Sequence, residues 1–193
     1  MASRRAGDIF QLKVTLIDVE PAVWRCLLVP ASMTLGKLHN VLQIAMGWTE
    51  SHLHCFMFGD RRFGRPDLED FAEDLEDERR VRLLSLIRRK EDALLYEYDF
   101  GDGWKHAIEV ETTLHPDERL AYPLCIGGAG ACPPEDCGGT YGYEHLLRVL
   151  AKPKDPEHDH LLAWVGGYFD PAGFDANAVN KTLRYGRSWV VKP

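Results

Sequence analysis

The segment YEYDFGDGWKHAIEVE, at residues 96–111, restricts the fold more than any other part of the chain because it contains its own turn. Gly101-Asp102-Gly103 reads as a three-residue loop with a glycine available for the left-handed position. The flanking strands then place apolar side chains on one face and polar ones, such as Asp99 and Lys105, on the other. An antiparallel sheet built around this hairpin is expected. The inner-face pairs of this register are Phe100–Trp104, Tyr98–His106, Tyr96–Ile108 and Leu94–Val110.

Apolar patterns outside the hairpin supply the other expected elements. Residues 9–19, 22–29 and 52–58 are expected to be strands, and 34–47 a helix that ends near Gly47. The remaining elements expected are a short helix at 81–87, hairpin strands at 93–100 and 104–112, and helices at 141–151, at 155–165 and after Asp175. The fold class is therefore α+β: a curved antiparallel sheet of about five strands with one packed helix and a C-terminal helical layer.

The composition is that of a single globular domain spanning 1–193, with its core at about 9–185. Hydrophobic residues make up 45% of the chain and charged residues 27%, which is ordinary for a soluble domain. Residues about 60–80 are strongly acidic and are expected to form a surface insert. Residues about 116–140 are rich in Pro, Gly and Cys, and this composition favours an ordered, packed loop.

The net charge of the chain and its N-terminal sequence argue against several classes of function. A net charge of -7 and a pI of about 5.6 argue against nucleic-acid binding. The first ten residues lack the apolar run of a secretory signal, and no stretch is long enough to span a bilayer, so we expect a cytoplasmic location. Five cysteines, an odd number in a reducing compartment, argue against a disulfide framework. A protein or small-molecule partner is therefore favoured over nucleic acid, and no membrane partner is expected.

Most candidate site residues lie in the hairpin and in the Cys/Pro/Gly loop. His106 points inward, where a core-edge histidine bonded to a tyrosine or a carbonyl is favoured over a ligand or general base. Turn chemistry is favoured for Asp102. Glu135 and Asp136 follow two prolines and, with Asp99 or Asp102, are candidates to hold a divalent cation, although a solvated loop tip is favoured. The full candidate pocket comprises His54, Tyr98, Asp99, Asp102, Trp104, His106, Glu135 and Asp136.

The cysteines offer a weaker metal hypothesis. Cys125, Cys132 and Cys137 have the spacing C-x6-C-x4-C, which lacks the close cysteine pair of most zinc sites. Small buried cysteines that pack a tight loop are the favoured alternative. A fourth ligand for a metal could come from His52, His54, His106 or Asp136.

Several sequence blocks together resemble one family. They are WRCLLVPASMTLGKLHNVLQIAMGW, HLHCF, YEYDFGDGWKHAIEVE, CIGGAGACPPEDCGGTYGYEHLL and FDPAGFDANAVNKTLR, within a span from Ile9 to Arg184. The chain is similar to the plasmid open-reading-frame-three-like family of Ri-plasmid type, also called TnpR-like passenger proteins of insertion elements. The resemblance implies an α+β domain associated with mobile elements and no established activity. Its label suggests a resolvase, but this acidic chain lacks a serine-recombinase start and a helix-turn-helix tail.

Two functional hypotheses follow, and whether the protein is an enzyme is left open. The leading one is a non-enzymatic binding or accessory module, because no complete catalytic constellation is present in the sequence. The alternative is a metal-dependent hydrolase or nuclease with a site between the hairpin at 99–106 and the loop at 132–138. Direct DNA binding is a third hypothesis, and it requires an affinity that falls steeply with salt.

Overall fold

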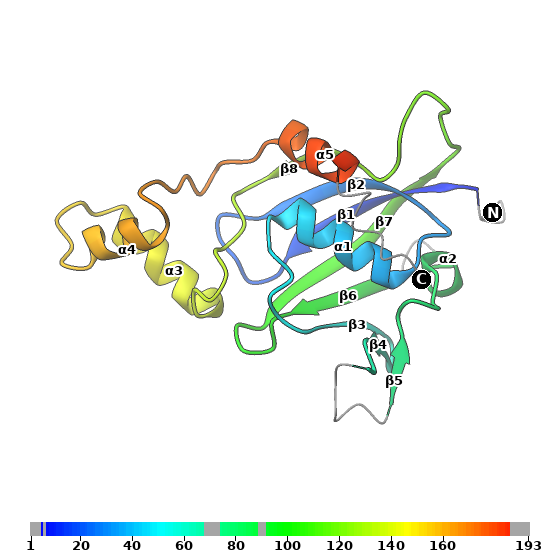
Figure 1. Cartoon of the computed structure of the whole chain (residues 1–193), viewed down its shortest axis with the longest axis horizontal. Helices are drawn as coiled ribbons and strands as arrows, with labels where there is room; N and C mark the ends of the chain where they lie inside the picture. The colour runs from blue at the N-terminus through cyan, green and yellow to red at the C-terminus, as the bar shows by residue number, and fades with distance from the viewer. Residues whose placement is uncertain (1–4, 6, 68–73, 89–91, 186–193) are drawn as a thin grey trace.

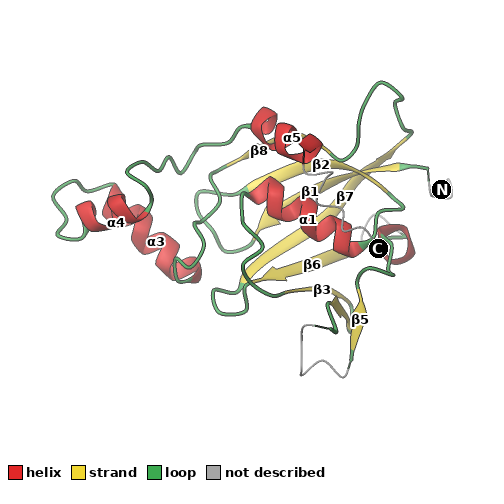
Figure 2. Cartoon of the chain, in the orientation of Figure 1, coloured by secondary structure: helices red, strands yellow, loops and turns green. Residues whose placement is uncertain are grey.

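A computed structural model describes residues 5, 7–67, 74–88 and 92–185 of the chain. These residues form one eight-stranded sheet, in the order β5-β4-β3-β6-β7-β1-β2-β8, and five helices (Figures 1 and 2). Every neighbouring pair is antiparallel except β4 and β5, and the expected α+β class is confirmed. The strands are β1 (Ile9–Leu16), β2 (Trp24–Pro30), β3 (His54–Phe58), β4 (Arg61–Gly64), β5 (Leu75–Asp77), β6 (Ala93–Tyr98), β7 (Trp104–Leu114) and β8 (Leu124–Ala129). The helices are α1 (Leu35–Met46), α2 (Leu83–Leu86), α3 (Gly139–Leu150), α4 (His158–Trp164) and α5 (Ala176–Tyr185).

Helix α1 covers the central strands of the sheet (Figure 1). Its start is fixed by the Thr34 hydroxyl, which accepts a hydrogen bond from the Lys37 amide at 3.4 Å. Its end is fixed by Gly47, whose φ of 100° places it in the left-handed region that favours glycine. Leu35 and Leu38 are fully buried within the core cluster, so burial of this apolar face stabilises the helix.

The hairpin between β6 and β7 forms with a longer turn than the sequence suggested. Tyr98 pairs with Trp104 and Tyr96 with His106, so the turn spans 99–103 and the expected pairing was wrong by two residues. Because side chains alternate along a strand, a shift of two keeps the same residues on the inner face. The register expected from the sequence does, however, misplace the turn residues themselves. Phe100 is 45% exposed rather than inward, and Asp99 is buried rather than paired outward with Lys105.

The expectation of about five strands was also wrong, because three strands at or next to the edges of the sheet, β4, β5 and β8, were not predicted. β4 and β5 lie in the acidic stretch, whose residues 68–73 are outside the described part of the chain. Both are short and charged, and β5 is an edge strand, where such sequences are common. β8 lies in the Cys/Pro/Gly loop and contains two glycines, which have low strand propensity. It forms because it can pair with β2 at the open edge of the sheet.

The three C-terminal helices do not form one continuous layer. α5 contacts both β8 and α1, and its start is capped by Asp175, whose Oδ1 accepts from the Asn177 amide at 2.8 Å. α3 and α4 pack against each other and extend beyond the ends of the strands (Figure 1). Tyr143 and Leu146 nevertheless anchor α3 in the core cluster. Among the described residues, no helix is long and apolar enough to cross a membrane.

Candidate functional site

Three loops from distant parts of the sequence meet at one end of the sheet. They are the segment between α1 and β3 (47–53), the β6–β7 turn (99–103) and the segment between β8 and α3 (130–138). The Trp48 indole Nε1 donates to the Pro133 carbonyl at 3.0 Å and joins the first loop to the third. We call this region the loop junction.

A second link joins the turn to the third loop. The Asp102 carboxylate accepts a hydrogen bond from the Gly138 amide at 3.1 Å. A Cβ at Gly139 would lie 2.6 Å from the Asp102 carbonyl oxygen, so the two backbones are in close contact. The Asp102 carboxylate therefore holds the two loops together. The turn chemistry expected of Asp102 is supplied instead by Asp99, whose Oδ1 accepts from the amides of Gly101 and Asp102.

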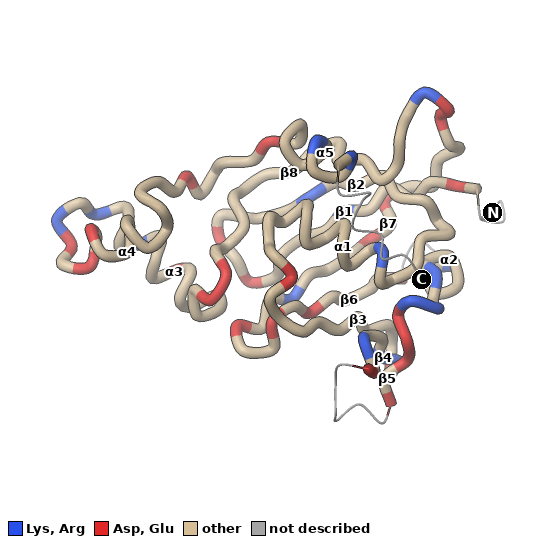
Figure 3. Tube along the Cα trace, viewed as in Figure 1, with Lys and Arg blue, Asp and Glu red and all other residues tan. Residues whose placement is uncertain are grey.

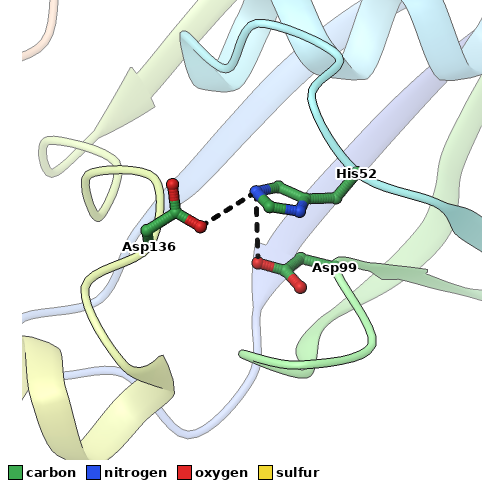
Figure 4. Close-up of side chains that lie close together, drawn as sticks. All are labelled: His52, Asp99 and Asp136. Carbon is green, nitrogen blue, oxygen red and sulfur yellow. Dashed lines mark ion pairs between the residues drawn. The ribbon is translucent and has the colours of Figure 1, made fainter.

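His52 lies between two carboxylates at the loop junction, as Figure 4 shows. Its Nε2 is 3.2 Å from Asp136 Oδ1 and 3.6 Å from Asp99 Oδ2. The ligand atoms of these three residues all lie within 4.8 Å of one another. Glu135 adds a third carboxylate, with Oε2 3.8 Å from the same nitrogen. Three acidic groups thus converge on one imidazole.

The local backbone explains how the two aspartates reach His52. Asp99 and Asp136 have φ values of 56° and 58°, in the left-handed region that Asp adopts more readily than most residues. Asp99 Oδ1 accepts hydrogen bonds from the amides of Gly101 and Asp102, at 2.9 and 3.3 Å. Its Oδ2 remains directed at His52. The turn therefore fixes Asp99 with one oxygen and leaves the other for the site.

Glu135 is held by the first loop and by the hairpin. Its Oε1 accepts from the Thr49 amide at 2.9 Å and from the Tyr98 hydroxyl at 3.0 Å. Burial, followed by the hydrogen bond to Glu135, raises the pKa of Tyr98 far above its ordinary value. Tyr98 consequently stays protonated and donates to Glu135 at neutral pH.

An aromatic cluster supports the loop junction from the core. Trp48 stacks on Tyr98 with ring centroids 4.8 Å apart and meets His106 edge-on at 5.3 Å. Trp104 and His106 are almost fully buried, so neither is open to a ligand from solvent. His106 Nδ1 lies 3.2 Å from the Tyr96 carbonyl, as the favoured core-edge interpretation requires. Burial lowers the pKa of His106 to about 4, so the ring is neutral at pH 7.

Other predicted site residues lie apart from this cluster. His54 Nε2 lies 2.8 Å from Glu78 Oε2, and the ring stacks on His39 rather than facing Asp99. Among the described residues, no group of three ligand atoms that could hold a metal includes a cysteine. Burial raises the pKa of Cys137 to about 12, so without a metal the thiol is protonated at neutral pH.

The arrangement of His52, Asp99 and Asp136 suits a divalent cation. Ligand atoms about 2.1 Å from one ion lie roughly 3.0–3.4 Å apart in octahedral or tetrahedral geometry. The 3.2 and 3.6 Å separations from His52 Nε2 are close to that range. The Asp136 side chain is 73% exposed, so one side of the cluster is open to solvent.

The sequence offered Glu135 and Asp136, with Asp99 or Asp102, as candidate cation ligands, although it favoured a solvated loop tip, and it did not join His52 to them. The expected strand began at residue 52, whereas β3 begins only at His54, so His52 lies in the loop. The acidic character of the loop junction was detectable from the sequence. Figure 3 shows acidic positions in the β6–β7 turn and charges of both signs interspersed elsewhere.

Comparisons with known proteins give relatives without a stated activity. A family model described as "Plasmid pRiA4b ORF-3-like protein" matches residues 8–178. The "Uncharacterized protein y4hQ" of Sinorhizobium fredii is 42% identical over 179 residues, which is 92% of this chain and 91% of the relative. The crystal structure of a protein of unknown function, MM3350 from Methanosarcina mazei Go1, is similar with a TM-score of 0.81 and 33% identity. That similarity covers 88% of this chain and 96% of the other.

Proposed function

Because this chain belongs to the plasmid pRiA4b ORF-3-like family, whose relatives named above have no stated activity, we propose a function from the loop junction itself. The protein binds a divalent cation through His52, Asp99 and Asp136 and acts as a metal-dependent hydrolase. The observation that carries the proposal is the convergence of these ligand atoms, within 4.8 Å, from three separate loops.

The chemistry of the site supports a hydrolytic role. One imidazole and two carboxylates leave coordination positions for water on the side where Asp136 is exposed. A divalent cation lowers the pKa of its bound water and can polarise a substrate carbonyl or phosphoryl oxygen. Glu135 borders the same space and adds negative charge that favours a cation. The acidic surroundings favour a small-molecule substrate over a nucleic acid.

The binding step is tested by calorimetric titration of chelator-treated protein with manganese, zinc or magnesium chloride. We expect about one ion per chain, and D99N and D136N should weaken binding at least about tenfold because each removes an anionic ligand. E109Q is the control, since it neutralises an exposed carboxylate of β7 that lies outside the ligand group. Absence of saturable binding for all three metals, or wild-type affinity in D136N, contradicts the proposal.

The catalytic step needs its own assay. Metal-loaded protein is incubated with p-nitrophenyl acetate, p-nitrophenyl phosphate and an aminoacyl p-nitroanilide, which represent ester, phosphate and amide substrates. Turnover of at least one of them should require the ion and should be lost in D136N. Tight metal binding without turnover of any of the three would leave the protein a metal-binding module and remove the hydrolase assignment.

A second candidate is a non-enzymatic binding module that uses the same end of the sheet. Leu53 and Phe100 are 40% and 45% exposed, and the Leu53 carbonyl accepts a hydrogen bond from the Asp99 amide at 2.9 Å. Two exposed apolar side chains beside the acidic cluster suit a protein or small-molecule partner. Loss of partner binding in F100A but not in D136N would favour this candidate. The association with mobile elements and the cytoplasmic location, both expected from the sequence, remain predictions.

A further inference from the structure

His52 also lines a pocket of about 220 Å³ next to the proposed cation site. The pocket is also lined by His39, Glu50, Leu53, His54 and Arg65. Of the three proposed cation ligands, His52 lines this pocket, whereas Asp99 and Asp136 do not. The pocket is therefore a separate space with its own chemistry.

A buried hydrogen-bond chain fixes the proton on His39. The Gln43 amide nitrogen donates to the Tyr96 hydroxyl oxygen at 3.1 Å, and that hydroxyl lies 2.9 Å from His39 Nδ1. Since the hydroxyl accepts from Gln43, its own hydrogen is available for His39 Nδ1. Burial lowers the pKa of His39, which favours the neutral ring, and a Tyr96 hydroxyl that donates to Nδ1 leaves the one ring proton on Nε2.

That Nε2–H group is buried, and its one nearby acceptor among the described residues, Glu50, is distant. His39 is 2% exposed, and its Nε2 makes no hydrogen bond to any described residue. The nearest ion-pair partner, Glu50 Oε1, lies at 3.5 Å, which is long for a hydrogen bond. The ring cannot turn away easily because His54 stacks on it with centroids 3.5 Å apart. An unsatisfied buried donor that lines a pocket points to a ligand with an acceptor.

Opposite charges border the same pocket. Glu50 has a φ of 58°, and its amide donates to Gln43 Oε1 at 2.9 Å, which fixes the backbone that presents the carboxylate. Arg65 uses Nε and Nη2 to bind Asp67, at 3.0 and 2.8 Å. Within the described part of the chain, Nη1 makes no hydrogen bond and is available for another acceptor. The pocket thus presents a cationic donor, a neutral donor and a carboxylate.

We propose that this pocket binds a small zwitterion of α-amino-acid size. Arg65 Nη1 and His39 Nε2 bind the carboxylate of the ligand, and Glu50 binds its ammonium group. Leu53 and the imidazole walls contact its side chain. A volume of about 220 Å³ admits a molecule of this size but not a large cofactor. The inference goes beyond the hydrolase proposal and does not require the cation.

The test is calorimetric titration of chelator-treated protein with glycine, L-leucine, L-methionine and L-histidine. At least one is expected to bind saturably with about one molecule per chain. N-acetyl-L-leucine and L-leucinamide, or the capped forms of whichever amino acid binds, should bind at least about tenfold more weakly because each lacks one charge. Absence of saturable binding for all four amino acids, or equal affinity for the capped forms, overturns the proposal.

Matched variants locate the binding in this pocket. E50Q and R65Q should each weaken amino-acid binding at least about tenfold, because each removes one charge that the ligand meets. E109Q and R61Q, which neutralise side chains outside the pocket lining, should bind as the wild type does. Wild-type affinity in E50Q or R65Q overturns the proposal. D136N is expected to retain amino-acid binding, so the failure of one site is distinguishable from the failure of the other.

Discussion

At the scale of single residues, Asp99 divides its carboxylate between folding and binding. Oδ1 caps the turn through the amides of Gly101 and Asp102, while Oδ2 faces His52. An asparagine retains one side-chain oxygen for the turn and tolerates the left-handed backbone, but it carries no charge. D99N should therefore fold while it loses cation affinity, and this makes it more informative than an alanine at the same position.

His106 gives a residue-scale prediction about pH. Burial lowers its pKa from 6.5 to about 4, so between these values the unfolded chain binds a proton that the folded chain does not. The free energy of unfolding should therefore fall as pH drops from about 6.5 toward 4, by about 3 kcal/mol if His106 acts alone. Above about pH 6.5 this contribution is fully present and constant. Urea unfolding at pH 7, 6, 5 and 4.5 measures the change.

The variant H106Q tests the assignment of this pH dependence. Glutamine cannot titrate, so the slope between pH 6.5 and 4 should decrease even though the variant is less stable overall. Burial also lowers the pKa of His39, which contributes a slope of the same sign and should remain in H106Q. An unchanged slope in H106Q would show that His106 is not the main cause.

At the scale of elements, the helices and strands with a strong local sequence pattern were the ones that could be predicted. Helix α1 has a long apolar stripe, a Thr34 cap and a terminal Gly47, and its expected bounds were within a residue of those observed. The faces of β6 and β7 were also correct, because an error of two residues preserves side-chain alternation. β4, β5 and β8 have no such pattern, since pairing with a neighbouring strand, rather than propensity, stabilises them.

Two adjacent glycines of β8 allow an element-scale prediction. A Cβ at Gly128 would lie 2.7 Å from the Phe174 ring and from the Trp24 carbonyl oxygen. G128A should lower the free energy of unfolding by about 1–3 kcal/mol, because ring and backbone must both shift. At Gly127 the nearest atom, on the Trp24 ring, is 4.0 Å away, so G127A should be nearly neutral. Urea titrations of both variants check this, and equal stability losses would contradict it.

The candidate site was predictable only in part because its members come from different elements. The chemistry of Glu135 and Asp136, with Asp99 or Asp102, made a cation site one of two interpretations, the favoured one being a solvated loop tip. The approach of these carboxylates to His52 depends on loop conformation. Asp99 and Asp136 reach it through left-handed backbones, which a sequence pattern does not specify for aspartate. The pocket beside His39 depends on a hydrogen-bond chain through Gln43 and Tyr96, which only tertiary structure brings together.

At the scale of the whole molecule, an ion at the loop junction would link three segments that are far apart in the sequence. We therefore predict that the cation stabilises the folded protein as a unit. At a free ion concentration of 100 times Kd, the free energy of unfolding should rise by about 2.7 kcal/mol if the unfolded chain does not bind the ion. Thermal unfolding with and without manganese measures the effect as an increase in Tm.

The control for this effect is again D136N, whose Tm should rise clearly less with manganese than that of the wild type, whereas E109Q should respond as the wild type does. A similar increase in Tm for D136N would mean that the ion stabilises the protein from elsewhere.

The two-residue difference between the expected and observed turn has an evolutionary consequence. A shift in strand pairing by an even number of residues keeps the aromatic side inward, whereas an odd shift does not. An insertion confined to residues 99–103 leaves the pairs Tyr98–Trp104 and Tyr96–His106 unchanged, so a relative with a longer turn could retain the same sheet. Such a change would still displace Asp99 from His52. The length of this turn is thus constrained by the site more than by the fold, and a natural insertion there would mark a relative that has changed its chemistry.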